Sequence, residues 1–76
     1  MKISILCTDP NHPVIGSLQA WIKDMSSKGH STTLVFDKAE LPGGDILFLV
    51  SCSQMIRDAE RGKYNAVLVL HASDLP

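Results

Sequence analysis

Four short apolar runs, separated by polar stretches, dominate the pattern of the chain. They occupy residues 2–7, 31–36, 45–50 and 66–70. Runs of this length are too short for buried helices, and strands with apolar residues on both faces are typical of parallel sheets. The pattern therefore predicts four strands, and we expect the last of them, 66–70, to be buried on both faces.

A helical period separates the first two runs. Apolar residues recur there at intervals of three and four: Val14, Ile15, Leu18, Trp21, Ile22 and Met25. This spacing places them on one face of an amphipathic helix, which would pack against the sheet. We expect Asn11 or His12 to cap this helix, Pro13 to occupy its first position, and Gly29 to end it in the left-handed conformation.

The remaining connections are short. Residues 37–44 contain the breaker Pro42-Gly43-Gly44 and leave no room for a full helix. A short helix is expected to start at Ser53 or Asp58 and to end near Gly62. Together these elements predict an α/β fold with a Rossmann-like, doubly wound parallel sheet, in which the four strands take the order second, first, third, fourth.

Composition narrows the class of protein. A chain of 76 residues forms one small domain, 1–76, and a content of 45% hydrophobic and 20% charged residues argues against disorder. Because the net charge is −1 and Lys and Arg are scattered, we expect no nucleic-acid surface. Cys7 and Cys52 are too few for a disulfide scaffold, and no run has the length of a signal peptide or membrane span. We therefore expect a cytoplasmic, reduced protein without membrane association.

Polar segments follow three of the predicted strands: residues 8–12, residues 51–54 and His71. Because the carboxyl ends of parallel strands meet at one edge of a sheet, where ligands bind, we expect these segments to line one crevice. One alternative for the ligand is a nucleotide or phosphate bound by residues 8–12. The absence of Gly-x-Gly-x-x-Gly after the first strand speaks against that alternative.

Two other kinds of site are not supported. Four residues with metal-ligating side chains are expected near this edge: Cys7, Asp9, Cys52 and His71. They lack paired ligand spacing, so we expect no metal site. His71, Ser73 and Asp74 have the residue types of a hydrolase triad, but such triads assemble from distant positions, and the glycines of a nucleophile elbow are absent.

The end of the chain resembles a known family. Residues 66–76, Ala-Val-Leu-Val-Leu-His-Ala-Ser-Asp-Leu-Pro, are similar to the active-site strand of the 10-formyltetrahydrofolate-dependent formyltransferases, which include methionyl-tRNA formyltransferase and the sugar N-formyltransferases. Residues 2–10 are similar to the family's first strand and loop, and residues 44–56 look like its donor strand. The final motif is closer to the sugar-type or uncharacterised members than to the tRNA enzyme.

The resemblance implies an activity. Members of this family transfer a formyl group from 10-formyltetrahydrofolate, the donor cofactor, to a small-molecule amine such as that of an amino sugar nucleotide. His71 would be catalytic, because a histidine with a pKa near 6.5 can donate a hydrogen bond to the oxyanion or help to move the proton of the attacking amine. The residues that hold the pterin through backbone groups would be Ser51, Cys52, Ser53, Gln54, Met55 and Ile56. Those on the substrate side would be Asp9, Asn11, Ser73 and Asp74.

Two features depart from the family. Its asparagine two residues before the histidine is replaced by Val69, and Asn65 lies at the other end of the predicted strand, about 20 Å from His71. The family's aspartate lies further downstream than Pro76. The resemblance thus implies a truncated, amino-terminal part of a catalytic domain, inactive on its own. A non-catalytic remnant or interaction module of the same fold is the alternative.

Residues 66–70 would form an edge strand wherever the family's later strands are missing. The strand contains no lysine or proline, the residues that discourage pairing between sheet edges. We therefore expect the chain to self-associate across this edge as a dimer, or else to be poorly soluble.

Overall fold

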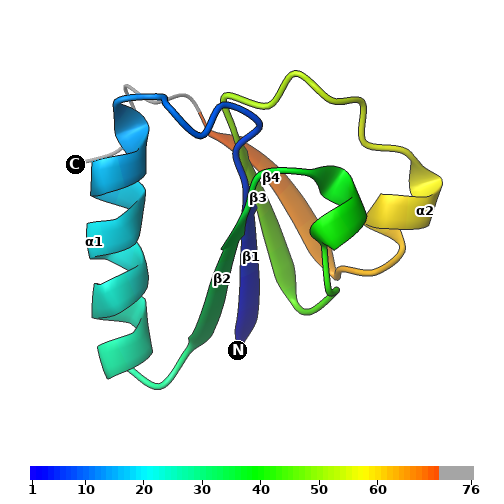
Figure 1. Cartoon of the computed structure of the whole chain (residues 1–76). Helices are drawn as coiled ribbons and strands as arrows, with labels where there is room; N and C mark the ends of the chain where they lie inside the picture. The colour runs from blue at the N-terminus through cyan, green and yellow to red at the C-terminus, as the bar shows by residue number, and fades with distance from the viewer. Residues whose placement is uncertain (71–76) are drawn as a thin grey trace.

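Four parallel strands form one sheet in the structure, a computed structural model that describes residues 1–70. The strands are β1 (Lys2–Leu6), β2 (Ser31–Val35), β3 (Ile46–Val50) and β4 (Ala66–Leu70), and their order is β2-β1-β3-β4 (Figure 1). All three pairs of neighbouring strands are parallel. The α/β class and the predicted strand order are therefore confirmed.

Three strands are one residue shorter than predicted. Cys7 and Phe36 lie just after β1 and β2, and Asp45 lies just before β3. The backbone of Cys7 still continues the ladder, because its N–H donates to the carbonyl of Val35 at 3.1 Å. Asp45 closes the opposite end of the sheet, where its carboxylate accepts from the backbone N–H of Lys2 at 2.7 Å. The differences are confined to the ends of the ladder.

Helix α1 (Val14–Ser27) begins one residue later than predicted, with Pro13 as its cap residue and not as its first residue. Pro13 already has helical backbone angles, with φ −58° and ψ −22°, which suits the fixed φ of proline. Nδ1 of His12 accepts a hydrogen bond from the backbone N–H of Val14 at 3.0 Å. Of the two expected capping residues, His12 therefore satisfies a free N–H of the first turn, and Asn11 does not.

The end and the buried face of α1 are also as expected. Gly29 has a φ of 89°, and its N–H donates to the carbonyl of Ser26, while the N–H of His30 donates to that of Met25. These two bonds form the left-handed helix ending that glycine favours. The six residues of the predicted apolar stripe are all buried or half-buried: Val14, Ile15, Leu18, Trp21, Ile22 and Met25.

The two faces of the sheet are covered differently. α1 lies on one face, and the 3-10 turn η1 (Lys38–Glu40) and helix α2 (Asp58–Arg61) lie on the other (Figure 1). The connection 37–44 holds only the turn η1, as its length predicts, and α2 starts at Asp58 rather than at Ser53. No helix in the described residues has the length and apolar content needed to cross a membrane.

Each face has its own apolar core. The core under α1 is built around five buried residues: Ile5, Cys7, Val14, Leu18 and Val50. The core of the opposite face is built around six: Leu6, Val35, Leu41, Leu47, Leu49 and Tyr64. Because side chains alternate along a strand, β1 and β3 contribute to both cores. The two strands in the middle of the sheet therefore hold the fold together.

β4 corrects one prediction. The strand was expected to be buried on both faces, but it lies at the edge of the sheet and pairs only with β3 among the described strands. Leu68 is 47% exposed and Val69 is 67% exposed, and these two side chains point to opposite faces. Apolar composition alone suggested burial, whereas burial also needs a neighbouring strand and a covering helix.

Candidate functional site

Two loops meet at the carboxyl edge of the sheet. Oγ1 of Thr8, after β1, accepts from the backbone N–H of Ser53 at 2.9 Å and donates to the carbonyl of Ser51 at 3.2 Å. It also lies 3.0 Å from Oγ of Ser53. The side chain of Thr8 therefore joins the loops after β1 and β3, which follow neighbouring strands of the sheet. His71, the residue expected to be the third partner, lies outside the described residues, as do Ser73 and Asp74.

The segment 51–57 joins β3 to α2, and some of its backbone N–H groups donate no hydrogen bond within the described residues. It starts at Ser51, which has a φ of 47°, the left-handed region that non-glycine residues rarely adopt. Among residues 1–70, no hydrogen bond is donated by the backbone N–H groups of Gln54, Met55 or Ile56. A strand-like segment with free donors can bind the polar edge of a planar ligand.

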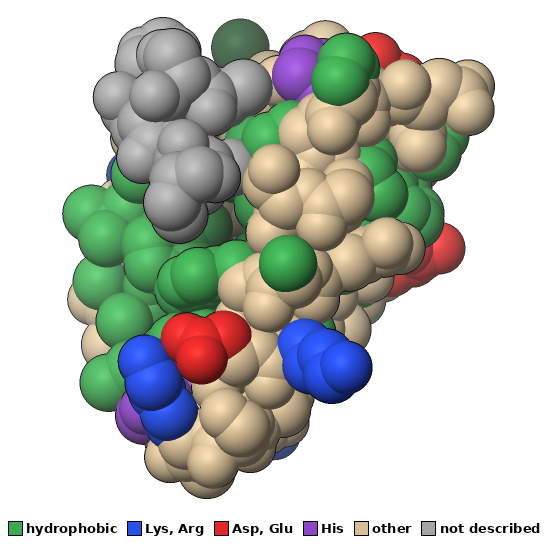
Figure 2. Space-filling model, turned by 90° about the vertical axis from the view of Figure 1, so that its left-hand side faces the viewer, with side chains coloured by type: hydrophobic (Ala, Val, Ile, Leu, Met, Phe, Trp, Pro, Cys, Tyr) green, Lys and Arg blue, Asp and Glu red, His purple; other side chains and the backbone are tan. Residues whose placement is uncertain are grey.

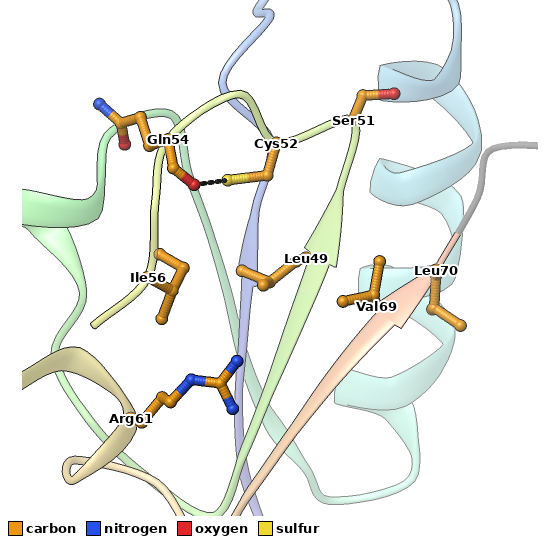
Figure 3. Close-up of a pocket in the computed structure, with 8 residues that line it drawn as sticks. All are labelled: Leu49, Ser51, Cys52, Gln54, Ile56, Arg61, Val69 and Leu70. Carbon is orange, nitrogen blue, oxygen red and sulfur yellow. Dashed lines mark hydrogen bonds between the residues drawn. The ribbon is translucent and has the colours of Figure 1, made fainter. Parts of the chain in front are cut away.

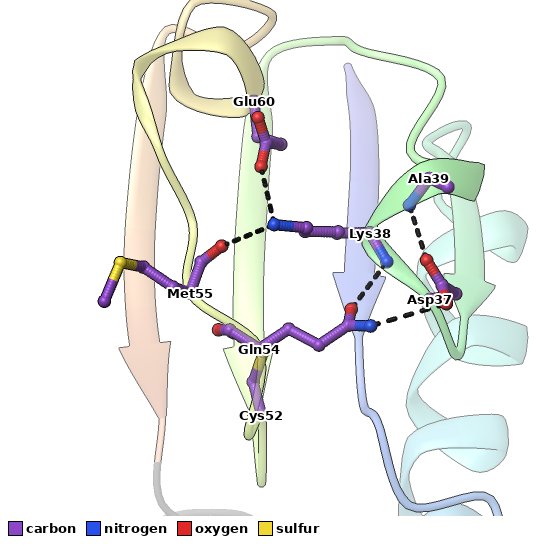
Figure 4. Close-up of polar contacts among 7 residues, drawn as sticks. All are labelled: Asp37, Lys38, Ala39, Cys52, Gln54, Met55 and Glu60. Carbon is purple, nitrogen blue, oxygen red and sulfur yellow. Dashed lines mark hydrogen bonds and ion pairs between the residues drawn. The ribbon is translucent and has the colours of Figure 1, made fainter.

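The side chain of Gln54 anchors this segment to η1 (Figure 4). Its Oε1 accepts from the backbone N–H of Lys38 at 2.8 Å, and its Nε2 donates to the carboxylate of Asp37 at 3.4 Å. Nζ of Lys38 in turn donates to the carbonyl of Met55 at 3.1 Å and lies 3.5 Å from the carboxylate of Glu60. The side chains of Gln54 and Lys38 therefore hold the segment 51–57 in place, and none of these contacts involves the backbone N–H groups of residues 54–56.

A cavity of about 320 Å³ lies beside this segment. Its floor is the surface of β3 and β4, represented by Leu49 and Val69, and its wall includes Ile56 (Figure 3). The complete lining is Leu49, Ser51, Cys52, Gln54, Ile56, Arg61, Val69 and Leu70. A lining that combines apolar side chains with a few polar groups is typical of small-molecule sites.

Arg61, the last residue of α2, brings a positive charge to the cavity. Figure 3 shows its side chain extending from α2 toward Leu49. Within residues 1–70 its guanidinium has no hydrogen-bond or ion-pair partner. The group is thus available to donate hydrogen bonds to a carbonyl, ring nitrogen or carboxylate of a ligand. The cavity therefore offers apolar surface from β3 and β4, and hydrogen-bond donors from the segment 51–57 and from Arg61.

The residues expected to hold the cofactor divide into two groups. Ser51, Cys52, Gln54 and Ile56 line the cavity, whereas Ser53 and Met55 do not. Ser53 is instead bonded to Thr8, and the side chain of Met55 is 68% exposed. From Cys52 to Ile56, every second residue therefore lines the cavity.

The described residues expected on the substrate side lie away from this cavity. Asp9 and Asn11 are exposed and do not line it. They contact each other instead, since Oδ1 of Asp9 accepts from the backbone N–H of Asn11 at 3.0 Å. Within the described part of the chain, no three His, Cys, Asp or Glu side chains are placed to share a metal ion.

The sequence pattern missed four cavity residues: Leu49, Arg61, Val69 and Leu70. Leu49 and Val69 belong to strands whose apolar residues all resembled core positions. For Arg61, the only available signal was the position of the short helix in the sequence. A four-residue helix that directly follows the segment 51–57 lies close to that segment and to the cavity beside it. Nothing in the spacing of charged residues singled out Arg61 from the other cations of the chain.

We compared the chain with protein-family models, curated proteins and solved structures, and none of them matches it. The resemblance to the formyltransferases therefore rests on the motif residues alone.

Proposed function

We propose that this chain forms the donor side of a formyltransferase of Rossmann-like, doubly wound fold, which moves a formyl group from 10-formyltetrahydrofolate to a small-molecule amine. The proposal combines the motif of residues 66–76 with the cavity beside residues 51–57. His71 would act on the oxyanion and on the proton of the attacking amine, and it directly follows Leu70 in the sequence.

The observation that carries the proposal is the coincidence of the cavity with the donor segment. Four of the six residues assigned to the cofactor by resemblance line one cavity: Ser51, Cys52, Gln54 and Ile56. The backbone N–H groups of Gln54 and Ile56 donate no hydrogen bond within residues 1–70, so they can donate to the acceptors of a pterin edge. Two further cavity residues support a flat heterocycle, because Leu49 and Val69 offer apolar surface to its faces.

A titration with 5-formyltetrahydrofolate, a stable isomer of the donor, tests the cofactor site. In proton–nitrogen NMR spectra we expect ligand at about 1 mM to shift the amide signals of residues 51–56 and the signal of the Arg61 side chain, because weak ligands bind at millimolar concentration. The amides of Lys23 and Asp24, on the far side of α1, serve as internal references. Unchanged signals at residues 51–56 would refute the donor assignment.

Two variants of β4 make this test specific. Val69→Phe would fill the cavity and should abolish the shifts, because the side chain of residue 69 forms part of its lining. Leu68→Phe is the matched control, since Leu68 is also exposed but points to the opposite face and does not line the cavity. Equal binding by both variants would place the ligand elsewhere.

Turnover by the 76-residue chain should be undetectable. Val69 supplies no hydrogen-bond donor where the family has asparagine, and the chain contains no residue matched to the family's aspartate. The assay is formylation of amino sugar nucleotides in the presence of 10-formyltetrahydrofolate. Product formation that His71→Ala removes would show that the histidine alone is sufficient.

A further inference from the structure

The outer edge of β4 carries backbone groups without a partner. Ala66 donates its N–H to the carbonyl of Asp45 at 3.1 Å, so the backbone of residue 66 faces β3. Because the backbone groups of successive residues point to alternate sides of a strand, those of Leu68 and Leu70 also face β3. The N–H and carbonyl groups of Val67 and Val69 then face outward, where no described strand lies.

We propose that two copies of this chain associate by pairing these edges as antiparallel strands, centred on Leu68. In this register Val67 of one copy faces Val69 of the other, and each such pair exchanges both backbone hydrogen bonds. The two-fold symmetry produces about four inter-chain bonds from the four outward-facing residues. Any register centred on another residue of β4 pairs fewer of these groups, so the strand is self-complementary in one arrangement.

The side chains of β4 fit the same arrangement. Leu68 of each copy lies opposite Leu68 of the other, in the kind of pair where side chains approach most closely. Leu68 and Val69 are the most exposed residues of the strand, at 47% and 67%, so pairing would remove apolar surface from water on both faces of the sheet. Figure 2 shows hydrophobic side chains gathered on part of the α1 side of the molecule.

Charge and composition favour a second copy as the occupant of this edge. β4 contains no charged residue, and the chain carries a net charge of only −1, so two copies approach without strong repulsion. The opposite edge of the sheet differs, because the exposed residues of β2 are Ser31 and Thr33. A partner of the β2 edge would bury hydroxyl groups, whereas a partner of the β4 edge buries Leu and Val.

Sedimentation equilibrium of the 76-residue chain tests the proposal. We expect a dimer at about 100 μM, the range in which small interfaces associate. Leu68→Lys places two ammonium groups opposite each other at the two-fold axis and should weaken the dimer by about tenfold or more, since like charges directly opposite are unfavourable. Thr33→Lys adds the same charge at an exposed position of the β2 edge and should leave the dissociation constant unchanged.

A cysteine variant tests the register. In a Cys52→Ser background, Leu68→Cys should form an inter-chain disulfide in oxidised glutathione, because residue 68 faces its own symmetry mate. Val69→Cys should form much less, because residue 69 faces residue 67 of the other copy. A monomeric parent chain, a Leu68→Lys dimer as tight as the Thr33→Lys dimer, or equal cross-linking of the two cysteine variants would overturn the proposal.

Discussion

β3 and β4 are neighbouring strands of nearly the same composition, Ile-Leu-Phe-Leu-Val and Ala-Val-Leu-Val-Leu, yet water reaches them very differently. Leu47 and Val50 in β3 are 0% exposed, whereas Leu68 and Val69 in β4 are 47% and 67% exposed. β3 has a strand on each side and contributes to both cores, and β4 has a strand on one side. Position in the sheet, and not hydrophobicity, therefore sets the contribution of each leucine to stability.

Truncating one leucine in each strand should give the largest difference. Leu47→Ala should lower the free energy of unfolding by about 2–5 kcal/mol, because it leaves a cavity in a packed core. A chain of this size is stable by only about 4–11 kcal/mol, so this variant approaches unfolding. Leu68→Ala should cost less than about 1 kcal/mol, because half of the side chain is already in water.

Urea unfolding followed by circular dichroism measures both variants. The protein concentration should be low, because a dimer would add to the apparent stability of the parent chain. Equal losses for Leu47→Ala and Leu68→Ala would mean that β4 is covered in solution, and the contrast between the two strands would then fail.

The sequence predicted the fold better than it predicted burial. Strand order followed from the apolar runs and the helical period, which are local signals, combined with the general rules of handedness and of doubly wound sheets. The exposure of Val69 followed only from the resemblance, which implied an edge strand at residues 66–70, whereas the apolar composition of the strand indicated burial on both faces. The ends of α1 were predictable, because His12 and Gly29 act through their own backbone and side-chain chemistry.

A buried polar contact should show the next largest effect. The hydroxyl of Tyr64 donates to Oγ of Ser4 at 2.9 Å and accepts from the backbone N–H of Gly43 at 3.0 Å. It connects the residues that precede β4 to the middle of the sheet. Tyr64→Phe leaves both partners without this hydroxyl and should lower the free energy of unfolding by about 1–3 kcal/mol.

A double-mutant cycle checks the assignment of that cost. If the bond to Ser4 is responsible, Ser4→Ala should reduce the penalty of Tyr64→Phe, because the two variants remove the same contact. Additive losses would assign the cost to Gly43 or to packing of the ring instead. Either result measures how strongly Tyr64 holds the start of β4 to the sheet. That contribution does not depend on the exposure of the strand's outer edge.

The candidate site was predictable in its location and only partly in its residues. Placing the segment 51–56 at the carboxyl edge followed from the direction of β3, and the contact with the loop after β1 followed from the strand order. The role of Gln54 was not predictable, because its carboxamide binds Asp37 and Lys38, which are 16 to 17 residues away in sequence. Arg61 was missed for the same reason, since tertiary packing directs it toward the cavity.

The smallest effect is expected at the loop that follows β3. Thr8→Val removes the acceptor of the Ser53 N–H and the donor to the carbonyl of Ser51, while it keeps the shape of the side chain. Because both partners are exposed and can bind water instead, the free energy of unfolding should fall by less than about 1 kcal/mol. The local consequence should be larger, since this side chain holds the start of the segment that lines the cavity. Hydrogen exchange at the amide of Ser53 should accelerate, while exchange in β1 and β3 stays close to that of the parent chain.

Ser27→Ala, which removes an exposed hydroxyl bonded to the carbonyl of Asp24 on α1, is the matched control and should leave the amide of Ser53 unchanged. If Thr8→Val leaves that amide as protected as before, the loop after β3 is held by the Gln54 contacts alone, and the two loops at the carboxyl edge are independent.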